Sequence, residues 1–207
     1  MRARLLFVLA GALLGACTAI PPVPAQYDFG LPTPAPRPPM APSSAPLALR
    51  DSAITVSAAP WLDSTALLYR PADTQPGALQ AYAHSAWVAA PAALLQQRLR
   101  EAAARRRGDA TAAAPVRLRV ALDEFSQVFT QGQTSHGQLR AHAQLISAMD
   151  EAVSRERHFV VDVPAPSSDA AGALAALRQA ADTFTEQVLD WAAARADQTT
   201  ARSPPSR

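Results

Sequence analysis

The clearest alternation of apolar and polar positions lies in the second half of the chain. In residues 116–122 Val, Leu, Val and Leu alternate with Arg, Arg and Ala, and residues 138–147 alternate equally regularly. This period of two predicts two β-strands, and the glycine-containing stretch 131–137 between them predicts a long antiparallel hairpin. Because Phe125 breaks the parity of the first strand, we expect a β-bulge at residues 123–124.

Four shorter segments also have strand character. Residues 53–57 alternate apolar and small polar side chains. Residues 66–70 follow a turn-like Asp63-Ser64 and precede Pro71, which would end a second strand there. Residues 78–83 give a weaker signal of the same kind. In residues 157–163 every second side chain is Phe or Val, which predicts one buried face.

Two segments have the composition and spacing of helices. Residues 91–107 consist mostly of Ala, Leu, Gln, Arg and Glu, with Pro91 in the first turn and Gly108 after the last. Ser168 and Asp169 can cap a second helix. Its apolar stripe consists of Leu174, Leu177, Ala181, Phe184, Val188 and Trp191. The order ββ(β)–α–βββ–α predicts an α+β fold, a mostly antiparallel sheet with both helices on one face.

The N-terminus has a different pattern. Arg2 and Arg4 precede a run of twelve apolar residues, 5–16, which is typical of a signal peptide and too short to span a bilayer. Leu14-Gly15-Ala16-Cys17 resembles a bacterial lipobox. This resemblance implies transfer of diacylglycerol to the Cys17 thiol, cleavage before Cys17 and acylation of the new amino group. Thr18 in place of Asp implies sorting to the outer membrane.

The prolines divide the chain into regions. Ten of the 19 prolines lie between Pro21 and Pro46, which favours extended, semi-rigid backbone. Tyr27 to Gly30 interrupts them and could add a short edge strand to the domain. The expected regions are a lipoprotein signal peptide (1–16), a lipidated Cys with a Pro-rich tether (17–46), a folded domain (47–196) and a disordered tail (197–207).

Charge and composition exclude several classes of function. All 19 basic residues are Arg, the net charge is +2, and the arginines are scattered except at 105–107. Nucleic-acid binding is therefore not expected. We interpret 105–107 as a solvated helix end, with a lipid-headgroup or partner patch as the alternative. The single cysteine rules out an internal disulfide, and no two histidines have the i, i+4 spacing of a helical metal site.

The polar residues also show no catalytic motif. Asp123 and Glu124 are neighbours on a strand and should point to opposite faces. Ser135 and His136 lie in the hairpin link without a nucleophile elbow, and no glycine-rich phosphate loop is present. We expect no catalytic, cofactor-binding or metal-ligating residue, and lipidation of Cys17 is the one predicted site. A dispersed active site stays open, because its residues need not be close in sequence.

Several segments resemble the ABC-type transport auxiliary lipoprotein family, which includes the lipoprotein of the paraquat-inducible intermembrane transport system. The strongest features are Tyr82-x₄-Trp87-x₃-Pro91 before a helix and then Glu124-Phe125-x-Gln127 in a strand. The further matches are the Cys17 lipobox, Tyr27, LDSTALLYR (62–70), the rest of 82–99 and 118–129, and VLDWAAA in the last helix. We interpret Tyr69, Tyr82, Trp87 and Phe125 as core or sheet-face residues, with partner contacts as the alternative.

The resemblance implies an outer-membrane-anchored periplasmic protein of an ABC-type intermembrane lipid transport system, acting in docking or tethering and not in catalysis. Its implied partners are a bridging periplasmic substrate-binding protein of the MCE type, the ABC permease complex and the outer membrane, and it allows a homo-oligomer. No cofactor is implied. Two alternatives stay open: a pilotin-like assembly lipoprotein, and an envelope hydrolase with a dispersed active site.

Overall fold

The structure is a computed structural model that describes residues 23–32, 53–71, 77–106, 116–130, 134–147 and 152–200. The expected signal peptide, Cys17, most of the Pro-rich segment and the last seven residues lie outside these ranges. The elements are β1 (Ala25–Tyr27), β2 (Ile54–Ala58), the 3₁₀ helix η2 (Pro60–Leu62), β3 (Ala66–Arg70), β4 (Gln80–Trp87), α1 (Pro91–Arg106), β5 (Val116–Phe129), β6 (Ser135–Ser147), β7 (Val153–Pro164) and α2 (Ala170–Thr200). In the described part of the chain, no helix is long and apolar enough to cross a membrane.

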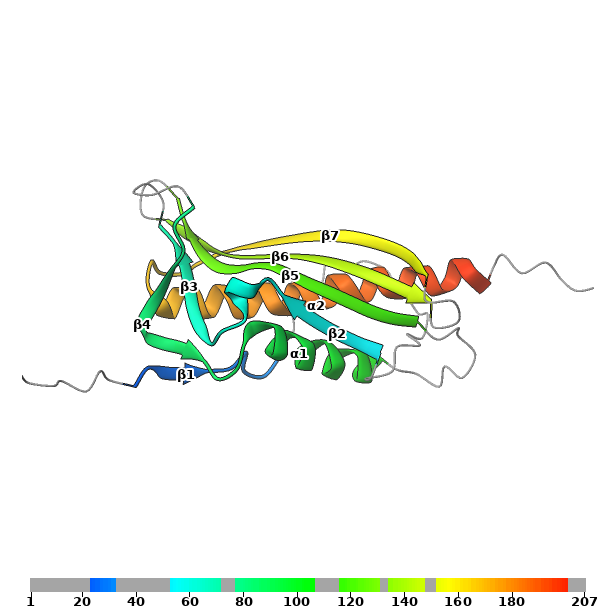
Figure 1. Cartoon of the computed structure of the whole chain (residues 1–207), viewed down its shortest axis with the longest axis horizontal. Coiled ribbons are helices and arrows are strands. Elements are labelled where there is room, and N and C mark those ends of the chain that lie inside the picture. The colour runs from blue at the N-terminus through cyan, green and yellow to red at the C-terminus, as the bar shows by residue number, and fades with distance from the viewer. Residues whose placement is uncertain are drawn as a thin grey trace, which may run out of the picture.

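The fold is α+β, and the predicted order of strands and helices is confirmed (Figure 1). A seven-stranded sheet runs β1-β4-β3-β5-β6-β7, and β2 pairs with β5 beside this path. Helix α2 packs along β5, β6 and β7, while α1 packs on β2 and against α2. The helices therefore form a second layer on the sheet.

The sheet is mixed rather than mostly antiparallel. The pairs β5–β6, β6–β7 and β3–β4 are antiparallel, whereas β1–β4, β2–β5 and β3–β5 are parallel. The cause is the length of β5, whose 14 residues offer one edge to two short strands in succession. Strand β2 pairs with residues 118–122 and β3 with residues 127–128. The chain passes from β2 through η2 into β3 without reversing, so both strands run parallel to β5.

The long hairpin and its bulge match the sequence pattern. Leu118, Val120 and Leu122 are fully buried, the register with β6 shifts between Leu122 and Glu124, and Phe125 then returns to the buried side. The predicted bulge at 123–124 is therefore confirmed. The expected inward residues of β6 and β7 are also buried; they are Leu139, Ala141, Ala143, Leu145, Phe159, Val161 and Val163.

Helix α2 lies with its apolar stripe on this core. All six residues of the predicted stripe are buried. Asp169 caps the helix, since its Oδ1 accepts the Gly172 N–H at 2.9 Å. Gly137 of β6 allows the first turns of α2 to approach, because a Cβ there would lie 2.9 Å from the backbone carbon of Ala176.

Residues 25–30 belong to the folded domain, although they lie in the range that the sequence assigned to the tether. Strand β1 pairs in parallel with β4, in the register Ala25 with Ser85 through Tyr27 with Trp87. Phe29 is only 5% exposed and joins the core. The edge strand considered for Tyr27 to Gly30 is thus present, two residues earlier.

Candidate functional site

The residues of the family-like motifs have definite places in the structure, whereas Cys17 lies outside the described residues. Arg70 and Glu124 form an ion pair on the sheet face away from the core. The Arg70 Nε and Nη2 atoms donate to Glu124 Oε2 at 2.9 and 2.6 Å. Asp123, the bulged neighbour, is exposed, whereas Glu124 is 7% exposed. The pair therefore fastens β3 to β5 instead of providing acid–base chemistry.

The motif aromatics meet around the N-terminal segment. The rings of Trp87 and Phe125 lie 5.7 Å apart, and Phe29 packs on both, at 5.3 Å from Trp87 and 5.6 Å from Phe125. Trp87 is fully buried and Phe125 is 1% exposed. These two are core residues, and burying the Phe29 side chain against them contributes about 2–3 kcal/mol to folding.

Gln127 connects four segments by side-chain hydrogen bonds. Its Oε1 accepts the Tyr82 hydroxyl, and its Nε2 donates to Ser135 Oγ at 2.7 Å and to the Ser167 carbonyl at 3.2 Å. Burial raises the pKa of Tyr82 to about 12, helped by the nearby Tyr69 and Asp169 side chains. Gln127 itself is fully buried, so each of its bonds replaces one that would otherwise be made to water.

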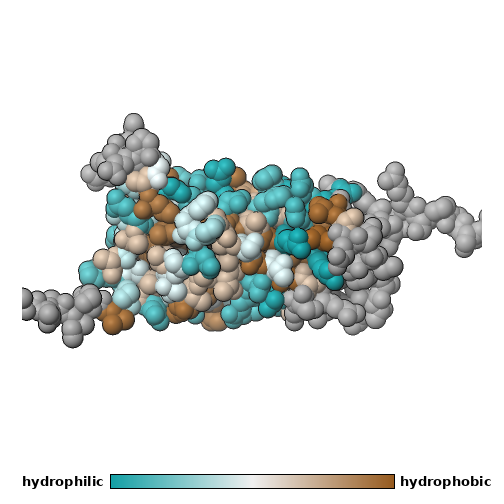
Figure 2. Space-filling model, in the orientation of Figure 1, coloured by the Kyte–Doolittle hydropathy of each residue, from teal (hydrophilic) through white to brown (hydrophobic). Residues whose placement is uncertain are grey.

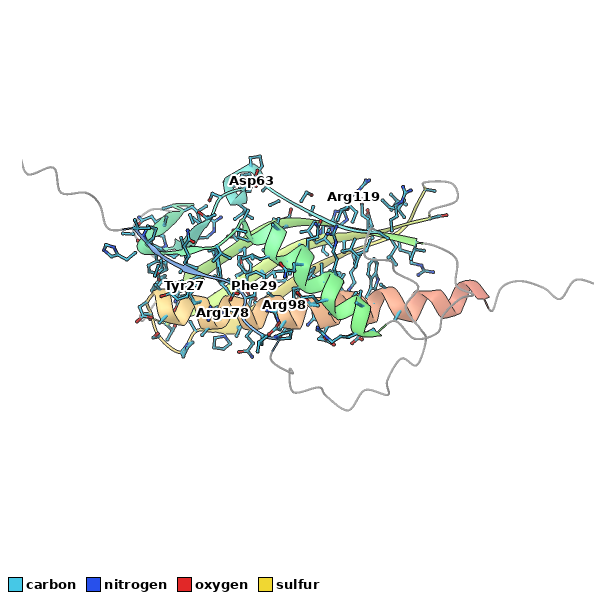
Figure 3. All side chains as sticks on the ribbon, turned by 90° about the horizontal axis from the view of Figure 1, so that it is seen from below. Tyr27, Phe29, Asp63, Arg98, Arg119 and Arg178 are labelled. Atoms are coloured by element: carbon cyan, nitrogen blue, oxygen red, sulfur yellow. The ribbon has the colours of Figure 1, made fainter. Side chains whose placement is uncertain are left out.

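Two arginines hold the N-terminal segment (residues 25–30) from the helix layer. Arg98 of α1 is 4% exposed, donates from Nη2 to the Gly30 carbonyl at 2.7 Å and pairs through Nη1 with Asp182 of α2 at 3.0 Å. Arg178 of α2 donates from Nε to the Asp28 carbonyl at 2.8 Å. Figure 3 shows both side chains beside Tyr27 and Phe29.

The turn after Phe29 depends on glycine. Gly30 has φ +67°, in the left-handed region, and its N–H donates to Asp28 Oδ1 at 2.8 Å. Sequence reasoning did not find the contact of this turn with Arg98. A signal existed, because Arg98 lies three residues after Leu95 on the apolar face of the helix, where a solvated arginine would not be expected.

The candidate catalytic groups do not come together. Ser135 is buried and bonded to Gln127, while His136 points to the other sheet face, where its Nε2 lies 3.6 Å from Asp162. His142 and His158 stack at 4.5 Å across β6 and β7. In the ranges that the structure describes, no group of three His, Cys, Asp or Glu side chains could hold a metal ion.

The domain has two ends that differ in charge (Figure 1). We call the end that carries β1 and the start of α2 the β1 end. We call the other the arginine end, where α1 ends and β5 and β7 begin. The exposed arginines of the arginine end are Arg105, Arg117, Arg119, Arg155 and Arg157. Arg119 lies on the sheet side away from α2 (Figure 3).

The arginine run at the end of α1 has two roles. Arg106 is half-buried and joins α1 to α2, through Asp190 at 2.7 Å and through Glu186. Arg105 is exposed, as a solvated helix end would be, and Arg107 lies outside the described residues. The run is therefore partly an interhelix contact, which the sequence interpretation missed because Glu186 and Asp190 lie about eighty residues away.

Comparisons with known proteins agree with this architecture. A crystal structure of a Xanthomonas campestris protein superposes with a TM-score of 0.64 at 24% identity, covering 88% of this chain and 98% of that one. The crystal structure of an uncharacterized protein gives a TM-score of 0.57 at 11% identity, covering 82% and 99%. These two likenesses show the fold. No curated protein matches the chain.

A family model supplies the identity. The model of the ABC-type transport auxiliary lipoprotein component matches residues 29–189. The match begins at Phe29, the residue that closes the aromatic cluster, and ends at Leu189 in α2, so it spans the sheet and both helices. The resemblance seen in the sequence is thereby confirmed, and the chain belongs to the family of ABC-type transport auxiliary lipoprotein components.

Proposed function

We propose that this protein is the outer-membrane-anchored docking component of an ABC-type intermembrane lipid transport system. The observation that carries the proposal is the family match over residues 29–189, which makes the chain a lipoprotein component of an ABC transport system in the cell envelope. ATP hydrolysis would belong to another subunit, and this protein would join the outer membrane to a periplasmic bridging protein of the MCE type and so to the permease complex.

The anchor in this proposal is Cys17. Its position after an apolar run and two small residues is that of a lipobox. A triacylated cysteine carries more than the single acyl chain that gives only reversible attachment. The Cys17→Ser chain should therefore leave the membrane fraction while its domain stays folded. A Cys17→Ser chain that still fractionates with the outer membrane would contradict the anchor.

The arginine end is the surface that suits docking of the bridging protein. Arg105, Arg119 and Arg155 are exposed and form no ion pair among the described residues. Arginine is enriched at protein interfaces, and complementary charge steers partners together. We propose that an acidic surface of the bridging protein meets this end.

A non-catalytic role accords with how the motif residues are used. Glu124 and Gln127 of the motif segment 118–129 and the nearby Ser135 bond to other parts of the fold, whereas the buried Ser126 hydroxyl has no hydrogen-bond partner among the described residues. The hydrolase alternative needs a reactive serine. Labelling by an active-site-directed serine probe, removed by substitution of a single serine, would favour that alternative over docking.

Co-purification from membranes tests the docking role. The tagged full-length chain should recover the bridging protein and the permease complex. The double variant Arg119→Gln with Arg155→Gln should lose most of this recovery. The matched control is Gln179→Glu with Gln187→Glu on the exposed face of α2, which changes the net charge equally and should retain it.

Two results would contradict the proposal. If the native chain recovers no transport component, the docking role fails. If it recovers an outer-membrane pore protein instead, and deletion of the gene abolishes assembly of that pore without altering lipid distribution, the pilotin-like alternative is favoured. Equal losses in the double variant and its control would remove the arginine end from the proposal.

A further inference from the structure

The linker between the predicted anchor and the domain is short. Residue 25 starts β1, and residues 25–30 are fixed by β4, by the aromatic cluster and by two arginines. Only six residue steps separate Cys17 from Val23, the first described residue, so they span at most about 21 Å. Helix α2, with 31 residues, is about 46 Å long. The linker therefore reaches less than half the length of the domain.

The strands at this edge contain no acidic residue and no basic residue other than His84. Strands β1 and β4 together contain no Asp, Glu, Lys or Arg. The other outer strand, β7, has charged side chains at Arg155, Glu156, Arg157 and Asp162. Exposed edge strands are usually protected by charge or by a covering element. Strand β1 is short, which limits pairing at this edge, but β1 and β4 lack the charge, and a covering surface would protect what remains exposed.

Exposed apolar side chains adjoin β1 in the sequence or lie beside it in the sheet. Of the six large exposed hydrophobic residues in the described chain, three flank β1: Val23 at 85%, Leu31 at 91% and Val88 at 48%. Val88 is next to the strand, because its N–H donates to the Tyr27 carbonyl at 2.8 Å. Figure 2 shows hydrophobic surface at the lower left, where the described chain begins.

We propose that the edge formed by β1, β4 and their flanking apolar residues lies against the phospholipid bilayer that holds the Cys17 anchor. The proposal rests on the lipidation of Cys17 in the proposed function. A bilayer is the surface expected at this edge, because the linker keeps Val23 within about 21 Å of the anchored Cys17. The arginine end then points away from the membrane, towards the periplasm.

The single cysteine makes a direct test practical. Once Cys17 is lipidated, a cysteine introduced elsewhere is the only free thiol in the chain. The Val88→Cys chain, lipidated and labelled with a small fluorophore, is reconstituted in vesicles of phosphatidylethanolamine and phosphatidylglycerol that contain a brominated lipid. The matched control carries the label at Ala104→Cys, an exposed site on α1 near the arginine end.

We expect lipid quenching at position 88 that is several-fold stronger than at position 104. Equal quenching at both positions, or quenching at 104 alone, would overturn the proposal. Disulfide-linked dimers of the unlabelled Val88→Cys chain, together with no quenching of the labelled chain, would also overturn it and would show that a second copy covers the edge.

The unlipidated chain separates this inference from the proposed function. With Cys17→Ser, the labelled Val88→Cys chain should no longer float with the vesicles. Flotation of this variant to the same extent as the lipidated chain would contradict the anchor, and with it the proposed function. Flotation of the lipidated chain without quenching at position 88 would contradict the orientation alone.

Discussion

The two ends of the domain use their charged side chains in opposite ways. At the β1 end, arginines are buried or half-buried and bind backbone carbonyls: Arg98 binds Gly30 and Arg178 binds Asp28. At the arginine end, Arg119 and Arg155 are exposed and form no ion pair among the described residues. Apart from Arg106, which joins α1 to α2, the arginine end therefore exposes arginines to solvent, whereas the arginines of the β1 end bond within the fold.

This difference predicts that stability and docking can be separated by substitution. Removing a buried, bonded group leaves its partner without a hydrogen bond in a dry environment, which is costly. Removing an exposed arginine changes the free energy of unfolding by less than about 0.5 kcal/mol. Changes at the β1 end should therefore lower stability, and Arg155→Gln at the arginine end serves as a common reference.

The largest effect is expected for Phe29→Ala. Phe29 is 5% exposed and contacts Trp87 and Phe125, so truncation leaves a cavity and should lower the free energy of unfolding by about 3–5 kcal/mol. Urea denaturation followed by tryptophan fluorescence measures it in the Cys17→Ser background. The nearby Leu31→Ala, at a residue 91% exposed, should change stability by less than about 0.5 kcal/mol.

A stable Phe29→Ala domain would contradict the role of the N-terminal segment. If its unfolding midpoint equalled that of Leu31→Ala, residues 25–30 would not be part of the cooperative unit. The domain would then begin near β2, as the sequence alone suggested, and the short-linker argument for the membrane edge would fail with it.

The next effect is expected for Arg98→Met. Methionine keeps much of the apolar stem but leaves the Asp182 carboxylate and the Gly30 carbonyl without this partner, so we expect a loss of about 3 kcal/mol. A double-mutant cycle with Asp182→Leu measures the pair directly. The second change should recover part of the loss, because the uncompensated buried charge is gone.

An additive cycle would show that the two side chains are not coupled. In that case the stability of the N-terminal segment would come from the Gly30 contact and the aromatic cluster. Arg155→Gln, made in the same background, should show no measurable loss; a loss equal to that of Arg98→Met would remove the contrast between the two ends.

The sequence predicted the strands and helices that are marked by a residue pattern within their own segment. The alternation of apolar and polar residues located β5, β6 and β7 with the bulge at 123–124. The apolar stripe from Leu174 to Trp191 located α2. The direction of β2 and β3 relative to β5 could not be read, because alternation is the same for parallel and antiparallel pairs. Strand β1 has three residues, too few to show a period.

The roles of the motif residues also needed the structure. The resemblance drew attention to Tyr82, Trp87, Phe125 and Gln127, but their contacts join residues far apart in sequence. The Tyr82–Gln127 bond spans 45 residues, and Phe29, which completes the aromatic cluster, came from the presumed tether. The sequence alone could therefore not show which contacts these residues make, because those contacts depend on packing between segments far apart in the chain.

The smallest effect on stability at the β1 end is expected for Tyr82→Phe. Its pH dependence distinguishes it from the other losses of stability. Loss of the hydroxyl removes the donor to Gln127 Oε1, which should lower the free energy of unfolding by about 1–2 kcal/mol at neutral pH. Burial also raises the pKa of Tyr82 from 10.0 to about 12 in the folded chain. The folded state therefore keeps this proton at pH values where the unfolded state loses it.

The sign of the pH dependence follows from this shift. The contribution of Tyr82 is fully present below pH 10.0 and is lost as the pH rises from 10.0 to about 12, because deprotonation favours the unfolded chain in that window. Urea denaturation between pH 9 and pH 11 should therefore show a steeper fall in stability for the parent chain than for Tyr82→Phe. Arg155→Gln should follow the parent slope. Equal slopes for the parent and Tyr82→Phe would show that the hydroxyl is as well solvated in the folded chain as in the unfolded one, and that the Gln127 bond does not hold β4 against β5.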